Sequence, residues 1–140
     1  MLGNSVQVIS VYFSMLIFFV IAEAIVLTNF IAPMFRHTLG DAMRETTNFQ
    51  LASIFYIVYV AGIYWFVVKE GTRLESIGIT IFSGAFLGLL AFGTFDITNF
   101  LILKKWTYQL VVFDIAWGIT ITTLLSLIGF YVSSLFTPTN

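Results

Sequence analysis

Four long runs of apolar residues follow one another along the chain, and proline or charged residues close each of them. The runs cover about 6–31, 49–68, 77–103 and 110–136, and the first is expected to end before Pro33. A membrane-spanning helix needs about 20 consecutive apolar residues, which each run supplies. Since lipid offers the backbone no hydrogen-bond partner, all four runs are expected to be helices.

The pattern predicts an all-α fold: a polytopic integral membrane protein with four transmembrane helices in one bundle. Residues 1–140 are expected to form a single domain, because the connections 32–48, 69–76 and 104–109 are too short for a soluble one. The N-terminal run is expected to be retained as a membrane anchor, since no basic segment precedes it and it is longer than the apolar part of a signal peptide.

Composition supports the membrane class and excludes several activities. Of the 140 residues, 59% are hydrophobic and 9% charged, whereas soluble domains carry about 25% charged residues. The net charge of -1 argues against nucleic acid as a partner. With no cysteine and His37 as the single histidine, we expect no metal and no cofactor. No G-x-S-x-G motif occurs, so no catalytic residue is assigned, and an enzyme is the less favoured class.

The distribution of basic residues predicts the orientation in the membrane. All six lie in loops: Arg36, Arg44, Lys69, Arg73, Lys104 and Lys105. The first and third loops hold two each, against two in the second loop, which faces the other side of the membrane. The positive-inside rule therefore places the first and third loops in the cytoplasm.

Three acidic residues lie inside the predicted spans: Glu23, Asp96 and Asp114. Each is nearer to the end joined to the first or third loop, so all three are expected in one leaflet. At a rise of 1.5 Å per residue, Glu23 and Asp96 lie roughly 12 Å from their loop ends, still within hydrocarbon. Charged residues at a helix centre cost about 2.5–3.5 kcal/mol on insertion scales, so such acids normally face the bundle interior.

Polar neighbours at helical spacing accompany the acids. Asp96 and Asn99 are three residues apart and share a helix face, as do Asp114 and Trp117. This arrangement indicates a ligand-binding or proton site. The predicted site residues are Glu23, Asp96, Asn99, Asp114 and Trp117.

Structural roles for the acids stay open beside that interpretation. Asp96 could accept a hydrogen bond at a helix break, and Asp114 could favour the positive dipole end of the fourth helix. Glu23 could bridge two helices as a protonated acid. The coincidence of three acids in one leaflet is what favours a site.

Glycine and aromatic residues give weaker signals. Gly84 and Gly88 have the spacing that lets helices approach closely, within the chain or in a homodimer, and Gly118 is expected to serve packing as well. Tyr56 could offer a hydroxyl to the bundle interior. Trp106, near a span end, is expected to belong to the interfacial aromatic belt.

Two motifs resemble a known family. "FGTFDITNFLILKKW" followed by "VVFDIAWG" resembles the bacterial membrane family called domain of unknown function 2177, and "FRHTLG" resembles a further pattern of that family. The motif positions matched are Arg36, Leu39, Gly40, Asp96, Thr98, Asn99, Lys104, Trp106, Asp114, Ala116, Trp117 and Gly118. Glu23 stands where an aspartate is usual. The resemblance implies a four-helix protein of the bacterial cytoplasmic membrane and supplies no activity.

Three functional hypotheses follow. The favoured one is a small membrane protein that binds or translocates a proton, a cation or a lipid-like ligand at the acidic cluster, with Arg36, Lys104 and Lys105 contacting headgroups at the mouth. The second is an interaction subunit of a larger membrane complex or a homo-oligomer. The third is a membrane enzyme or accessory factor in lipid modification. Few ionisable residues are expected in the other leaflet, which weakens the case for transport.

Overall fold

The chain folds into a bundle of helices, and the computed structural model describes residues 2–138. Four helical stretches are long and apolar enough to cross a membrane: Asn4–Ala42, Phe49–Arg73, Ile77–Ile102 and Tyr108–Ser134. No strand occurs within residues 2–138. The prediction of an all-α protein with four transmembrane helices is therefore confirmed.

The first span continues past the proline that was expected to end it. Helix α1 (Leu2–Val26) passes through a π-helical turn, η1 (Leu27–Ile31), into α2 (Ala32–Leu39), which includes Pro33. Pro33 has no N–H to donate to the helix. In the wider turn before it, the Ala32 N–H donates to the Leu27 carbonyl, five residues earlier, and the helix continues. Membrane helices tolerate proline where a local change of helix type satisfies the backbone again. The predicted end at residue 31 is therefore wrong.

Glycine ends this helix. Gly40 has a φ of 52°, in the region that favours glycine, and a short 3-10 turn, η2 (Gly40–Ala42), follows. The chain then runs without regular structure to Asn48, whose side chain accepts a hydrogen bond from the Leu51 N–H at 3.0 Å. This cap begins the second span.

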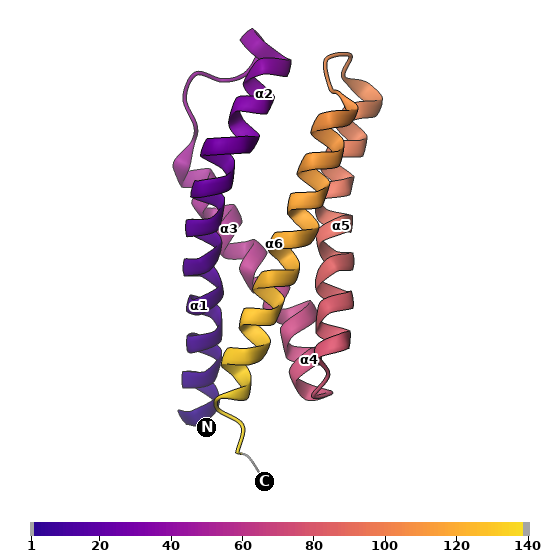
Figure 1. Ribbon diagram of the computed structural model, residues 1–140. Helices are drawn as coiled ribbons and strands as arrows, with labels where there is room; N and C mark the ends of the chain where they lie inside the picture. Colours follow the sequence, from indigo (N-terminus) through magenta and orange to yellow (C-terminus); the bar gives the residue numbers. More distant parts are fainter. Residues whose placement is uncertain (1, 139–140) are drawn as a thin grey trace.

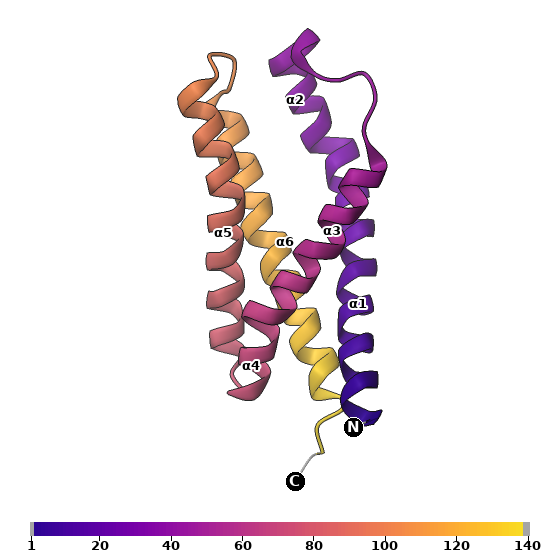
Figure 2. The same ribbon diagram turned by 180° about the vertical axis from the view of Figure 1, so that it is seen from behind.

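The second span crosses the bundle at an angle to the others. It consists of α3 (Phe49–Ile63), a second π-helical turn, η3 (Tyr64–Val68), and α4 (Lys69–Arg73). Figures 1 and 2 show it beginning beside the upper part of the first span and ending beside the third. The second span is therefore tilted relative to the other three.

The third and fourth spans form an antiparallel hairpin. Helix α5 (Ile77–Ile102) and helix α6 (Tyr108–Ser134) lie side by side in both ribbon views. A Cβ added to Gly84 would lie 2.6 Å from Ser126 Oγ, and one added to Gly88 would lie 2.5 Å from the Gly118 carbonyl oxygen. These glycines therefore mark a close approach between two helices of the same chain.

An apolar core fills the half of the bundle nearer the termini. It draws on the first, second and fourth spans and consists of Val11, Met15, Phe19, Val60, Ile63, Val67, Val68, Ile121 and Leu125. Buried hydroxyl residues accompany this core in the same half of the bundle: Thr80, Thr122, Ser126 and Ser133. The buried acids lie in the other half, beyond this core.

Candidate functional site

The structure brings the three intramembrane acids together. Glu23 comes from α1, Asp96 from α5 and Asp114 from α6, and their exposed fractions are 9%, 0% and 8%. Asp96 and Asp114 are neighbours at the α5–α6 interface, and Glu23 lies near Asp114. None of the three faces the surrounding lipid, and all lie in the half of the bundle toward the first and third loops.

Glu23 is tied to the fourth span through Trp117. The indole Nε1 of Trp117 donates a hydrogen bond of 2.6 Å to Glu23 Oε1. Trp117 follows Asp114 by three residues, so the two side chains are neighbours on α6, where Trp117 meets Glu23 of α1 and Asp114 meets Asp96 of α5. The spacing of Asp114 and Trp117 pointed to a shared face, but the sequence did not indicate that Glu23 would be the bonding partner.

Asp96 is the most deeply buried of the acids. Although Asp114 lies beside it, neither carboxyl oxygen of Asp96 has a well-formed hydrogen bond among residues 2–138. Buried polar atoms in proteins nearly always have such a partner, so this carboxyl group is an energetically costly exception. Asp96 shares a face of α5 with Asn99, three residues later, and Asn99 is half-buried.

Trp106 is buried near Asp96 rather than exposed to lipid. Its side chain is 7% exposed, and its Nε1 has no hydrogen-bond partner in the described part of the chain. Its ring meets the rings of Phe35 and Phe95 edge-on, at centroid distances of 5.2 and 5.5 Å. The expectation of an exposed belt residue is therefore wrong. The connection between α5 and α6 thus places its tryptophan against Phe35 of α2.

The basic residues assigned to the mouth do not contact the acids. Arg36, Lys104 and Lys105 are exposed, and the single ion pair within residues 2–138 joins Arg73 to Glu70. Among the same residues, no group of three His, Cys, Asp or Glu side chains is arranged to hold a metal ion. Among the residues that the structure describes, the buried acidic cluster thus has no cationic partner.

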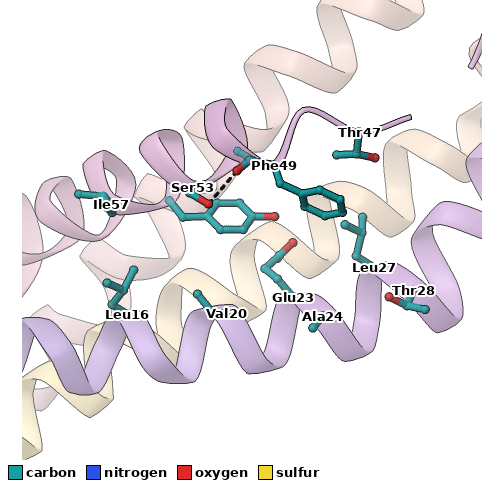
Figure 3. A pocket seen from close by; sticks show the side chains of 12 residues that line it. Leu16, Val20, Glu23, Ala24, Leu27, Thr28, Thr47, Phe49, Ser53 and Ile57 are labelled. Carbon is teal, nitrogen blue, oxygen red and sulfur yellow. Dashed lines mark hydrogen bonds between the residues drawn. The ribbon is translucent and has the colours of Figure 1, made fainter. Parts of the chain in front are cut away.

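A pocket of about 430 Å³ lies between the first span and α3, with Glu23 in its wall. In Figure 3 the Glu23 side chain points from α1 into the space between the two helices, on the side where Phe49 lies. Among the described residues that line the pocket, Glu23 is the one acidic residue, and no basic residue is present. The lining residues are Leu16, Val20, Glu23, Ala24, Leu27, Thr28, Thr47, Phe49, Ala52, Ser53, Tyr56 and Ile57.

Sequence reasoning missed most of this pocket. Tyr56 was singled out for its hydroxyl and does line it. Thr28, Thr47 and Ser53 carried no signal, because isolated hydroxyl residues are common in membrane helices and often bond to their own backbone, as Ser53 does with the Phe49 carbonyl at 2.7 Å. The apolar lining residues resemble lipid-facing ones in sequence.

Comparison with known proteins adds the family and no activity. Residues 8–131 match the family model described as "Predicted membrane protein (DUF2177)". The match contains all three acids, both paired motifs and the three loops, and it confirms the resemblance seen in the sequence. No curated protein and no solved structure matches the chain.

Proposed function

The chain belongs to the DUF2177 family of membrane proteins, and on that premise we propose that it binds an amphiphilic, lipid-like ligand between α1 and α3. The family description gives a membrane location and no activity, so the support comes from the site. The observation that carries the proposal is a largely apolar pocket inside a spanning region with one carboxyl group in its wall.

The dimensions and chemistry of the pocket suit an amphiphile. Its volume of about 430 Å³ falls within the roughly 300–1,000 Å³ of small-molecule sites. Side chains such as Leu16, Val20 and Ile57 offer contact to an alkyl chain. Glu23 Oε1 already accepts from Trp117, but a carboxyl group has capacity for further hydrogen bonds. A ligand with a hydroxyl or amine group would therefore be preferred over a plain hydrocarbon chain.

Binding is favoured over translocation by what lies beyond the acids. Toward the termini the bundle holds the nine apolar core residues and four buried hydroxyl residues, Thr80, Thr122, Ser126 and Ser133, and among the described residues no buried ionisable one. Paths for protons or cations through a membrane are usually marked by ionisable residues. Asp96 and Asp114 are not among the residues that line the pocket.

Photo-crosslinking with an alkyl amine or alcohol that carries a diazirine would test the proposal. We expect labelled peptides from α1 and α3 in the purified protein. Val20→Trp would fill the pocket and should abolish most of this labelling. Ile17→Trp is the matched control, because Ile17 is on the same helix, is 58% exposed and does not line the pocket.

Labelling that is equal in Val20→Trp and Ile17→Trp would show that the probe reacts from bulk lipid and would refute the ligand site. Glu23→Gln supplies a second comparison. It keeps the side-chain size and should weaken labelling by the amine probe more than by the alcohol, since only the amine gains from the carboxylate charge. An identical response of the two probes would contradict the role of Glu23.

We further infer that the first and third loops face the cytoplasm of a bacterial cell. They carry Arg36, Arg44, Lys104 and Lys105, against Lys69 and Arg73 in the second. The absence of native cysteine permits single-cysteine labelling without background. A cysteine that replaces the exposed Lys105 should react only with reagents that enter the cell. A cysteine that replaces the exposed Glu75 should also react with reagents that cannot cross the membrane. The reverse pattern would overturn this orientation.

Assembly into a homo-oligomer or a larger complex gains no support from the glycine pair. Gly84 and Gly88 pack against α6 of the same chain, so they are not available as a dimer surface. The surrounding bilayer accounts for the many exposed apolar side chains of the spans.

A further inference from the structure

A second recess lies at the opposite end of the bundle from the acidic cluster. It has a volume of about 520 Å³ and is formed where α1 begins, α4 ends and α6 ends. Figure 1 shows these three segments together, near the points marked N and C. Its polar lining residues are Asn4, Gln7, Lys69, Thr72, Arg73 and Ser133. None of them lines the pocket beside Glu23.

The charge of this recess is positive by about one unit. Lys69 and Arg73 are four residues apart and so share a face of α4. Arg73 Nε donates to Glu70 Oε2 at 2.8 Å, which neutralises the guanidinium charge. Lys69 has no such acidic partner among residues 2–138; its Nζ lies 3.8 Å from the centroid of the Trp65 ring. One cation is thus left uncompensated in the recess.

The Thr72 hydroxyl is a hydrogen-bond donor in the same lining as that cation. Thr72 lines the recess, and its hydroxyl oxygen is buried without a hydrogen-bond partner among the described residues. Gln7 Nε2 donates to Ser133 Oγ at 2.7 Å and to the Ser133 carbonyl at 3.1 Å, which holds the first and fourth spans together at this wall. The wall is therefore fixed, while Lys69 and Thr72 keep donors for an anion.

The position of the recess is that of lipid headgroups. Three spanning segments end there, and Trp65, one turn before Lys69, is 61% exposed, as expected for an aromatic residue at the membrane–water interface. Basic residues at this level attract anionic lipids. We propose that the recess binds the phosphodiester group of an anionic phospholipid in the leaflet opposite the acidic cluster. A single phosphodiester charge balances the single excess cation.

Native mass spectrometry of the detergent-purified protein would test this site. The probes are phosphatidylglycerol, phosphatidylcholine and soluble glycerol phosphate. We expect phosphatidylglycerol to bind best, because phosphatidylcholine brings its own cation and glycerol phosphate lacks the acyl chains. Full competition by glycerol phosphate would show a site for free phosphate anions and overturn the assignment to a lipid.

Two variants separate a built site from general attraction to positive charge. Lys69→Gln should weaken phosphatidylglycerol binding about fivefold, which corresponds to about 1 kcal/mol. Its matched control is Lys105→Gln, an exposed lysine at the other end of the bundle. The same loss in both variants, or no loss in Lys69→Gln, would refute the site.

The double variant Glu70→Gln/Arg73→Gln leaves the charge sum unchanged and removes the guanidinium group. It should also weaken phosphatidylglycerol binding, because Arg73 lines the recess and its guanidinium group keeps N–H donors beyond those bonded to Glu70. Unchanged affinity would show that the charge of Lys69 acts without a defined recess and would overturn the proposal. All three residues replaced on α4 are exposed, so thermal melting should be unaffected. This experiment does not involve the pocket at Glu23, and either proposal can fail alone.

Discussion

Replacing Gly88 by alanine is expected to push α5 and α6 apart. The added Cβ would lie 2.5 Å from the Gly118 carbonyl oxygen, 2.9 Å from Ile119 Cα and 3.0 Å from the Gly118 carbonyl carbon. Normal contacts between carbon atoms lie at about 3.5–4.0 Å. All three neighbours are backbone atoms, so no side-chain rotation can relieve the overlap, and the helices must separate by roughly 1 Å.

The expected net cost follows from two opposing effects. Overpacking a tightly packed interior costs about 1–3 kcal/mol, while exchanging glycine for alanine in a helix returns up to about 1 kcal/mol. Gly88→Ala should therefore lower the free energy of unfolding by about 1–2 kcal/mol. Gly93→Ala is the matched control on the same helix, because its Cβ would meet only the ends of the Leu89 and Ile115 side chains, at 3.9 and 4.0 Å.

Equilibrium unfolding in mixed micelles, followed by the loss of helical circular dichroism, would measure both variants. Gly93→Ala should be as stable as the unchanged protein or slightly more stable. If the two alanine variants had equal stability, the close approach of α5 to α6 at Gly88 would be refuted. Gly84→Ala should fall between them, because its nearest neighbour is the Ser126 hydroxyl, which can shift.

Two further predictions concern the buried acids and use the same unfolding measurement. Trp117→Phe removes the donor to Glu23 Oε1 and should cost about 1–3 kcal/mol, because it leaves a buried acceptor unsatisfied. In a Glu23→Leu background, which has no acceptor at this position, the loss should be smaller, and an equal loss would contradict the bond. Asp96→Asn should leave stability unchanged or raise it, because the carboxyl group is buried beside Asp114 without a well-formed hydrogen bond; a fall of more than about 1 kcal/mol would show that Asp96 has a stabilising partner.

The spans and the leaflet of the three acids could be predicted from the sequence. The faces that the helices turn toward one another could not. Hydropathy determines which segments enter lipid, and chain direction then places Glu23, Asp96 and Asp114 in one leaflet. The rotation of each helix about its axis cannot be read from hydropathy, because the face toward lipid and the face toward the core are both apolar. Only polar residues and glycines reveal it, as the spacing of Asp114 and Trp117 did.

The pocket beside Glu23 was hidden for the same reason. Residues such as Leu16 and Val20 line it, and nothing in their type distinguishes them from neighbours that face lipid. The errors at Pro33 and Trp106 have different causes. A π-helical turn next to the proline compensates for it, whereas the burial of Trp106 involves Phe35, which is distant in sequence.

The π-helical turn Leu27–Ile31 separates the registers of the two helices that it joins. A π turn accommodates one residue more than the corresponding α-helical geometry, so deleting a residue within it would restore a continuous α-helix and leave α2 close to its present orientation. Phe35 would then keep its contact with Trp106, and Glu23, which precedes the turn, would also keep its place. The turn thus lets the chain carry one extra residue between Glu23 and the first loop without changing the face that either side of the turn presents to the bundle.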